Sequence, residues 1–153
     1  MKIKDIMTTD VRTCSPGTSL AAAAALMLDG DCGILPVMDE GKLVGVVTDR
    51  DMYIALATRN TPASQVTVGE VARRQTWTCG PDDEVHAALE TMKAHRVRRL
   101  PVEGFNGSVL GIVSMNDVLL AAGARKAIRS DEVVDTLQGI CAHHHPAPHV
   151  AAA

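Results

Sequence analysis

Aromatic side chains and long charged runs are scarce in this chain of 153 residues. Aromatics make up 2% of it, with one Trp, one Tyr and one Phe. This composition does not favour a protein that stacks nucleobases on aromatic platforms. The net charge of −3 and the lack of a long basic run disfavour non-specific binding to a phosphate backbone. We therefore expect no nucleic-acid partner.

Long apolar runs and paired cysteines are also missing. No apolar stretch approaches the roughly 18 residues that a membrane span needs, and the first residues lack the apolar core of a signal peptide. We therefore expect no membrane association and a cytoplasmic location. The four cysteines, Cys14, Cys32, Cys79 and Cys141, show no C-x-x-C spacing. We expect them to be reduced and to pack mostly as small core residues.

Motifs of catalysis are absent as well. The sequence has no G-x-S-x-G elbow, no G-K-[ST] phosphate loop and no H-E-x-x-H metal motif. We therefore expect neither an enzyme nor a metal site. One alternative stays open, a redox- or metal-responsive protein that uses Cys141 and the histidines of the tail. Those histidines are His143, His144, His145 and His149.

What the sequence does contain is an internal repeat. Thr13 and Cys14 recur as Thr78 and Cys79, and many further pairs share the same spacing. The most informative pairs are Leu35-Pro36-Val37 with Leu100-Pro101-Val102, and Gly45-Val46-Val47-Thr48-Asp49-Arg50-Asp51 with Gly111-Ile112-Val113-Ser114-Met115-Asn116-Asp117. A duplication of about 60 residues therefore organises the chain.

Each repeat predicts the element order strand, helix, strand, strand, helix, from its apolar periodicity and its turn residues. The first unit predicts a helical turn at 3–7, a strand at 11–14, a helix from Thr18 or Ser19 to about Asp29, strands at 34–38 and 43–47, and a helix from Thr48 to about Thr58. The second predicts a helix from Asp82 or Asp83, strands at 100–102 and 109–113, and a helix to about Ala122. The expected division is unit one at 1–60, unit two at 66–123, a helical extension at 124–141 and a disordered tail at 142–153. One side of the extension is predicted to carry Val133, Val134, Leu137, Ile140 and Cys141.

The stretch from Gly45 to Asp51 reads as a strand that runs into a helix. Thr48 can occupy the helix N-cap with Asp51 three residues later, as in a capping box with Asp in place of Glu or Gln. Unpaired N–H groups at a helix N-terminus also attract anions. A structural cap and a ligand contact are both compatible with Thr48.

These paired motifs resemble the cystathionine-β-synthase (CBS) domain, and the duplication resembles the Bateman module of stand-alone bacterial-type proteins. The resemblance covers residues 1–123. It implies an α/β (α+β) fold in which two β-α-β-β-α units pack with pseudo-two-fold symmetry, followed here by a C-terminal helix. It also implies a cleft that binds an adenine nucleotide, with AMP ranked first and ATP, ADP, NAD or S-adenosylmethionine as alternatives.

Roles of single residues follow from the same resemblance. Asp51 and Asp117 would accept hydrogen bonds from ribose hydroxyls, and Thr48 and Ser114 would contact ribose or phosphate. Other matching positions would line the base or phosphate. The full set of expected ligand-binding residues is Thr13, Ile34, Leu35, Pro36, Thr48, Arg50, Asp51, Thr78, Arg98, Arg99, Leu100, Pro101, Ser114, Asn116 and Asp117.

The two halves differ in charge. Arg98 and Arg99 stand where unit one has glycine and isoleucine, and Arg50 stands where unit two has asparagine. The basic segment 95–99 is either a solvated loop or a source of phosphate ligands. Asp82 and Asp83, without acidic counterparts, are expected to oppose a polyphosphate. We therefore expect two sites of unequal preference.

The sequence thus favours a regulatory module that binds an adenine nucleotide and signals through its own homodimer or to a separate downstream protein. The apolar segments 52–57 and 118–122 are candidate dimer contacts. The alternatives are a structural or adaptor pair without ligand, and the redox- or metal-responsive protein.

Overall fold

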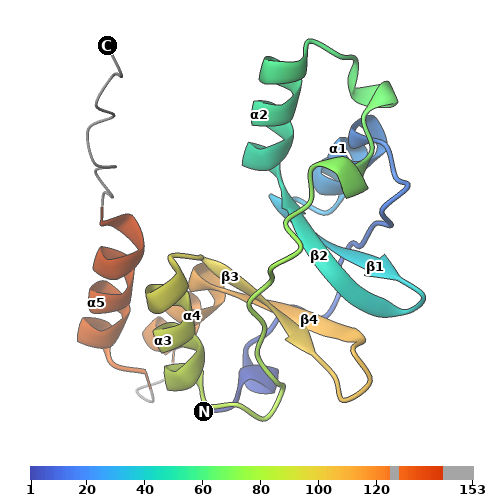
Figure 1. Ribbon diagram of the computed structural model, residues 1–153. Helices are drawn as coiled ribbons and strands as arrows, with labels where there is room; N and C mark the ends of the chain where they lie inside the picture. The colour runs from blue at the N-terminus through green and yellow to red at the C-terminus, as the bar shows by residue number, and fades with distance from the viewer. Residues whose placement is uncertain (125–127, 143–153) are drawn as a thin grey trace, which may run out of the picture.

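The computed structural model describes residues 1–124 and 128–142, and it contains two similar halves (Figure 1). Each half is built on a two-stranded antiparallel sheet flanked by helices. The first half contains α1 (Leu20–Asp29), β1 (Ile34–Asp39), β2 (Lys42–Thr48) and α2 (Asp49–Arg59). The second contains α3 (Val85–His95), β3 (Arg99–Glu103), β4 (Val109–Ser114) and α4 (Met115–Ala124). The 3-10 turns η1 (Ile3–Asp5), η2 (Ala63–Gln65) and η3 (Val68–Glu70) and the final helix α5 (Ser130–Cys141) complete the described part. The predicted α/β class is confirmed. The predicted tail lies outside the described residues apart from Ala142.

Local capping signals set several helix boundaries. The side chain of Ser19 accepts a hydrogen bond from the Ala22 N–H at 3.2 Å, and α1 ends at Gly30 as predicted. The side chain of Thr48 accepts from the Asp51 N–H at 3.2 Å, so the predicted cap of α2 is confirmed.

The predicted start of α3 at Asp82 or Asp83 is wrong, because Asp83 is engaged in the preceding turn and both residues are held by the N-terminal segment, with the Ile3 N–H donating to the Asp83 carbonyl at 3.0 Å. Asp83 accepts a hydrogen bond from the Gly80 N–H at 2.7 Å, and Asp82 forms an ion pair with Lys4 at 2.6 Å. The helix therefore begins at Val85.

The strand predicted at residues 11–14 is reduced to one bridging residue. Cys14 pairs in parallel with Val37. Pro16, two residues on, has no N–H to donate, and the Ser-Pro-Gly turn leads the chain away from the sheet. Cys79 makes the equivalent single bridge to Val102 in the second half.

The leading segments of the two halves are exchanged. Thr8 pairs with Ile112 on β4, and Arg73, at the equivalent position, pairs with Val46 on β2. Figure 1 shows the N-terminal turn beside the β3–β4 hairpin, with η2 and η3 beside α1. Each hairpin therefore carries one bridge from its own half and one from the other, and the halves interlock.

The two cores follow the same exchange. The first core contains Val66 and Val68, at 2% and 0% exposure, although they lie after the first unit in sequence. The second contains Ile3, at 0% exposure, from the N-terminal turn. Aliphatic side chains fill both cores, and those with no exposed surface include Leu20, Leu35, Val47, Leu89, Leu100 and Val113.

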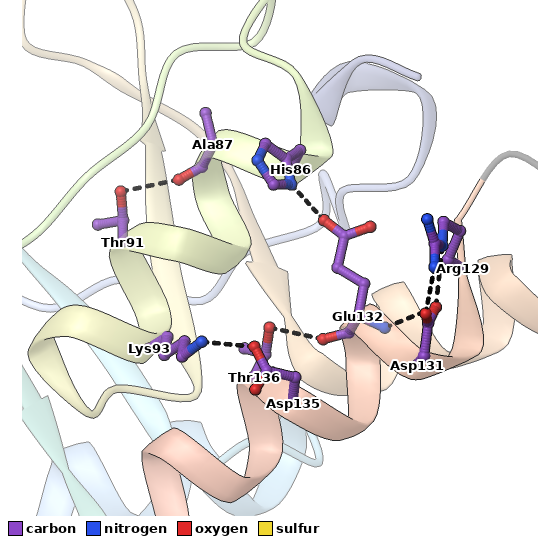
Figure 2. Close-up of polar contacts among 9 residues, drawn as sticks. All are labelled: His86, Ala87, Thr91, Lys93, Arg129, Asp131, Glu132, Asp135 and Thr136. Carbon is purple, nitrogen blue, oxygen red and sulfur yellow. Dashed lines mark hydrogen bonds and ion pairs between the residues drawn. The ribbon is translucent and has the colours of Figure 1, made fainter.

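Helix α5 packs against α3 (Figure 1, Figure 2). Val133, Thr136 and Ile140 are its buried residues. The predicted apolar side is therefore wrong at Val134, which is 53% exposed, and at Cys141, which is also exposed. Thr136 is compatible with burial because its hydroxyl donates to the Glu132 carbonyl at 2.9 Å.

Candidate functional site

A cavity of about 470 Å³ lies where the β2–α2 junction of the first half faces the second half. We call it the cleft. The second half contributes the segment before Cys79, the end of α3 and the start of β3, and α5 contributes one residue. The lining residues are Ile34, Val46, Thr48, Asp49, Arg50, Arg73, Gln75, Thr76, Trp77, His95, Arg96, Val97, Arg98, Arg99, Pro101 and Ile140.

The lining of the cleft is strongly cationic. Its arginines outnumber its carboxylates, since Asp49 is the only acidic side chain among the lining residues. Guanidinium groups bind phosphate in a bidentate manner, and the N-terminus of α2, which begins at Asp49, adds the positive end of the helix dipole. The arrangement therefore suits an anionic ligand. The cleft arginines are Arg50, Arg73, Arg96, Arg98 and Arg99.

All residues of the basic segment 95–99 line this cleft. The sequence predicts this segment either as a solvated loop or as a source of phosphate ligands. Arg96 has φ of 54°, a left-handed conformation that ends α3. The equivalent residue of the first half, Asp31, has the same conformation with φ of 45°. The repeated backbone geometry thus presents a cationic side chain to the cleft only in the second half.

Asp51 is held by Arg73 and Thr48 at the edge of the cleft. The Arg73 guanidinium donates to the two carboxylate oxygens of Asp51, with its Nη2 2.8 Å from Oδ1 and its Nε 3.2 Å from Oδ2. The Thr48 hydroxyl also donates to Asp51, at 2.7 Å. Burial would raise the pKa of Asp51, but the bonds from Arg73 and Thr48 outweigh it and hold that pKa below its ordinary value. Asp51 is therefore an ionised acceptor at neutral pH.

Asp117 occupies the equivalent place in the second half with weaker partners. It accepts hydrogen bonds from the Ser114 N–H at 2.8 Å and from the Ser114 hydroxyl at 2.5 Å. The residue from the exchanged segment is Thr8, whose hydroxyl lies 3.4 Å from the Asp117 carboxylate. Thr8 and Arg73 thus occupy matching positions with different chemistry.

An aromatic pair forms part of the cleft wall. The rings of Trp77 and His95 are stacked with centroids 3.4 Å apart and an interplanar angle of 6°. Both residues line the cleft. An aromatic wall beside cationic groups suits a ligand that combines a flat ring with an anion.

The expected site residues separate into three groups. Those brought to the cleft are Ile34, Thr48, Arg50, Arg98, Arg99 and Pro101. Those placed around the second acidic position are Ser114, Asn116 and Asp117, with Asn116 exposed on α4. Those that do not line the cleft are Thr13, Leu35, Pro36, Asp51, Thr78 and Leu100.

The third group has individual explanations. Leu35 and Leu100 have no exposed surface and belong to the two cores. Pro36 is buried, and its carbonyl accepts a hydrogen bond from the Cys14 N–H at 3.1 Å. Thr13 is exposed, and Asp51 is reached from the cleft through Arg73.

Sequence reasoning did not find Arg73, Thr8 or Trp77 as site residues. Thr8 and Arg73 do share the repeat spacing, so the alignment of the two units pairs them. They lie near the aspartates of the opposite halves because the leading segments are exchanged. No local sequence pattern predicts this exchange. Trp77 directly precedes the expected Thr78 and takes the position at the cleft.

Gly45 and Gly111 serve this exchange. A Cβ on Gly45 would lie 2.7 Å from the Arg73 carbonyl oxygen, and one on Gly111 would lie 2.7 Å from the Thr8 carbonyl oxygen. Both glycines therefore permit a close approach of neighbouring backbone.

Comparison with known families assigns the repeat. A family model described as "CBS domain" matches residues 3–58 and 68–123. The chain belongs to the CBS-domain family. It carries two CBS domains in tandem, and the suspected resemblance is confirmed.

Relatives and solved structures agree with this assignment. The CBS domain-containing protein YhcV of Bacillus subtilis is 34% identical over 116 residues, which cover 76% of this chain and 81% of that protein. Hypoxic response protein 1 of Mycobacterium tuberculosis is 33% identical over 116 residues, 75% of this chain and 80% of that protein. A crystal structure of the CBS domain pair of protein MJ0100, in complex with 5′-methylthioadenosine and S-adenosyl-L-methionine, has a TM-score of 0.74 and 29% identity and covers 81% of this chain and 97% of that one. A crystal structure of Hypoxic Response Protein I with two coordinated zinc ions has a TM-score of 0.68 and 31% identity and covers 78% of this chain and 98% of that one.

None of the helices in the described ranges is both long and apolar enough to cross a bilayer. Within residues 1–124 and 128–142, no group of three or more His, Cys, Asp or Glu side chains is arranged to hold a metal ion. The histidines of the metal alternative lie at 143–149, outside the described residues.

Proposed function

We propose that this CBS pair is a regulatory module that binds an adenine nucleotide in the cleft and passes the signal through its own assembly or to a separate protein. The observation that carries the proposal is the cleft itself. It combines a capped helix N-terminus, a set of arginines and an aromatic wall within one cavity. The MJ0100 pair, which is similar in fold and sequence, was crystallised with two adenosine-containing ligands.

Each part of a nucleotide has a matching chemical group. The phosphate would lie near Arg98, Arg99 and the first turn of α2. The ribose diol offers two donors, which a carboxylate such as Asp51 or Asp117 is able to accept. The base would lie against the apolar and aromatic surfaces of Trp77 and its neighbours.

The charge of the cleft orders the candidate ligands. Its arginines favour AMP, ADP, ATP or NAD over S-adenosylmethionine, because the sulfonium group of the latter is a cation. The expected opposition of Asp82 and Asp83 to a polyphosphate does not apply, because neither lines the cleft and Asp82 is paired with Lys4. AMP remains our first candidate, and the positive charge of the cleft is equally compatible with ADP and ATP.

The structure offers a surface for the proposed homodimer. A second hollow, lined by Met27, Leu28, Met52, Tyr53 and Leu56 among others, lies between α1 and α2. Leu28 and Tyr53 are 86% and 74% exposed, and on α4 Leu120 is 73% exposed. Exposed apolar helix faces in both halves are compatible with a disc formed by two CBS pairs.

The redox alternative receives little support from the two buried cysteines. Burial raises the pKa of the Cys14 thiol to about 11 and that of Cys79 to about 12. Thiolates are the reactive form, so both thiols are poor nucleophiles at neutral pH. The other two cysteines, the partly buried Cys32 and the exposed Cys141, lie outside this argument.

A thermal-shift screen tests the proposal. AMP, ADP, ATP, NAD and S-adenosylmethionine would each be added to the full chain at increasing concentration. A ligand held at 100 times its Kd stabilises the fold by about 2.7 kcal/mol, which corresponds to a rise in Tm of roughly 5–10 °C for a chain of this size. A rise with at least one nucleotide is expected. No shift with any of them would favour the adaptor without ligand.

A further inference from the structure

The two acidic positions of the CBS pair differ in what covers them. At Asp51 the cover is the Arg73 guanidinium, which makes two-pronged contact with the carboxylate. At Asp117 the residue at the matching position is Thr8, whose hydroxyl is 3.4 Å away. The side chain of Asp51 is only 11% exposed, whereas that of Arg73 is 60% exposed. A ribose that approaches Asp51 therefore meets a competing donor first.

The backbone of Arg73 is anchored to β2, whereas its guanidinium is held by Asp51 alone among the described residues. Its N–H donates to the Val46 carbonyl at 2.9 Å, and its own carbonyl accepts from the Val46 N–H at 3.1 Å. The tight approach to Gly45 fixes the same peptide. Among the described residues, Asp51 is the only hydrogen-bond or ion-pair partner of the guanidinium. The side chain is thus able to leave Asp51 while its Cα stays at the cleft.

We propose that Arg73 is a specificity-determining residue that admits a ribose to Asp51 only when the ligand also carries an anionic group. The inference rests on the proposed function. A neutral nucleoside would have to displace the guanidinium from Asp51 and would offer it no charged partner in exchange. A nucleotide offers its phosphate as a new partner, so one charge-assisted pair replaces another.

The same reasoning gives the Asp117 half the opposite property. No guanidinium of the exchanged segment competes there, because Thr8 is neutral and its contact is long. That half therefore accepts neutral nucleosides and nucleotides alike. The difference between Arg73 and Thr8, at equivalent positions, thus accounts for the unequal ligand preference expected of the two sites.

The test compares adenosine with AMP on the full chain. Trp77 is the only tryptophan and lines the same cleft as Arg73, so its fluorescence reports the Asp51 half. Calorimetry counts the total number of sites. The matched variants exchange the two residues: Arg73→Thr installs the second-half residue in the first half, and Thr8→Arg does the reverse. A cooperative thermal unfolding transition and an unchanged far-UV circular dichroism spectrum control for the folding of each variant.

In the unmodified chain we expect AMP to bind the Asp51 half at least tenfold more tightly than adenosine. Arg73→Thr should bring this ratio to within about threefold of one, chiefly by strengthening adenosine binding. Thr8→Arg should weaken adenosine at the other half and lower the calorimetric stoichiometry for adenosine. If Arg73→Thr binds AMP and adenosine in the same ratio as the unmodified chain, the inference is wrong while the proposed function stands. If neither ligand binds the unmodified chain, both fail.

Discussion

At the scale of single residues, the geometry around the two aspartates depends on two glycines and on the two residues that contact the aspartates. Gly45 and Gly111 let the exchanged segments lie against β2 and β4, and those segments then deliver Arg73 and Thr8 to the two aspartates. The packing of backbone and the chemistry of the site are therefore linked. A change that displaces either segment should alter both stability and ligand preference.

Substitution of Gly45 or Gly111 by alanine tests this link. The added Cβ meets a backbone carbonyl that has little freedom to move, so each variant should be less stable by about 1–3 kcal/mol, as for other overpacked sites. Gly17→Ala is the matched control, since nothing lies within 4 Å of a Cβ placed there. Urea denaturation measures the differences. Equal stability of Gly45→Ala and Gly17→Ala would contradict the close approach.

Helix α5 is the element that the repeat does not explain. It packs on α3, and two ion pairs cross the contact, His86 with Glu132 and Lys93 with Asp135 (Figure 2). At its far end Ile140 lines the cleft, and the Arg98 guanidinium lies 3.7 Å from the Cys141 sulfur. The docking of α5 is therefore positioned to respond to what the cleft holds.

The pairing of His86 predicts how this docking depends on pH. The hydrogen bond to Glu132 raises the pKa of His86 above its ordinary value of 6.5, with a smaller contribution from Glu90 on its own helix. A raised folded-state pKa contributes stability that is fully present below pH 6.5 and is lost as pH rises through the folded pKa. The hydrogen bond to Asp135 raises the pKa of Lys93, so Lys93 stays charged between pH 6 and pH 9.

We therefore expect α5 to be held more firmly at pH 6 than at pH 9. The free energy of unfolding from urea titrations should fall between these values in the unmodified chain and fall less in His86→Gln. His86 is 71% exposed, so the difference will be small. An identical fall in the variant would show that the pair does not contribute.

Helices and hairpins were predictable because their signals are local. The cap at Thr48, the end of α1 at Gly30 and the two hairpins follow from turn residues and apolar periodicity. Errors arose where distant contacts decide the outcome. The residues before α3 are held by backbone hydrogen bonds to the distant N-terminal turn, such as that from the Ile3 N–H to the Asp83 carbonyl. Val134 is exposed because the face of α5 is set by its packing on α3.

The Thr48–Asp51 arrangement was predictable from the sequence, whereas Arg73 and Thr8, which contact the two aspartates, were not. Thr48 and Asp51 carry a recognisable spacing within one stretch. Arg73 reaches Asp51 only because the segment after the first unit crosses to β2. The local sequence pattern fits equally well with a segment that pairs with the hairpin of its own unit. The exchange is therefore visible only in the tertiary structure.

At the scale of the whole molecule, the two halves form one interlocked body with exposed apolar helix faces. The turn η1 completes the second core, and η3 completes the first. Neither half buries its core without the other, so we expect the pair to unfold as a unit. The faces of α2 and α4 that carry Tyr53 and Leu120 are exposed and would be available to the proposed homodimer.

The proposed homodimer is tested by placing a charge on that face. Tyr53→Glu should shift the protein toward the monomer in sedimentation equilibrium, because a carboxylate would be desolvated at the contact. Phe105→Glu is the matched control, since Phe105 is likewise an exposed aromatic residue but lies in the turn between β3 and β4. A monomeric unmodified chain, or equal effects of both variants, would contradict this interface.

The central claim is that the cleft and its acidic positions bind an adenine nucleotide, and calorimetric titration with AMP tests it most directly. The full chain should release or absorb heat with a defined stoichiometry. The double variant Asp51→Ala and Asp117→Ala should bind at least tenfold more weakly while it keeps its fold by circular dichroism. Absence of binding to the unmodified chain would contradict the function, and unchanged binding to the double variant would contradict the site.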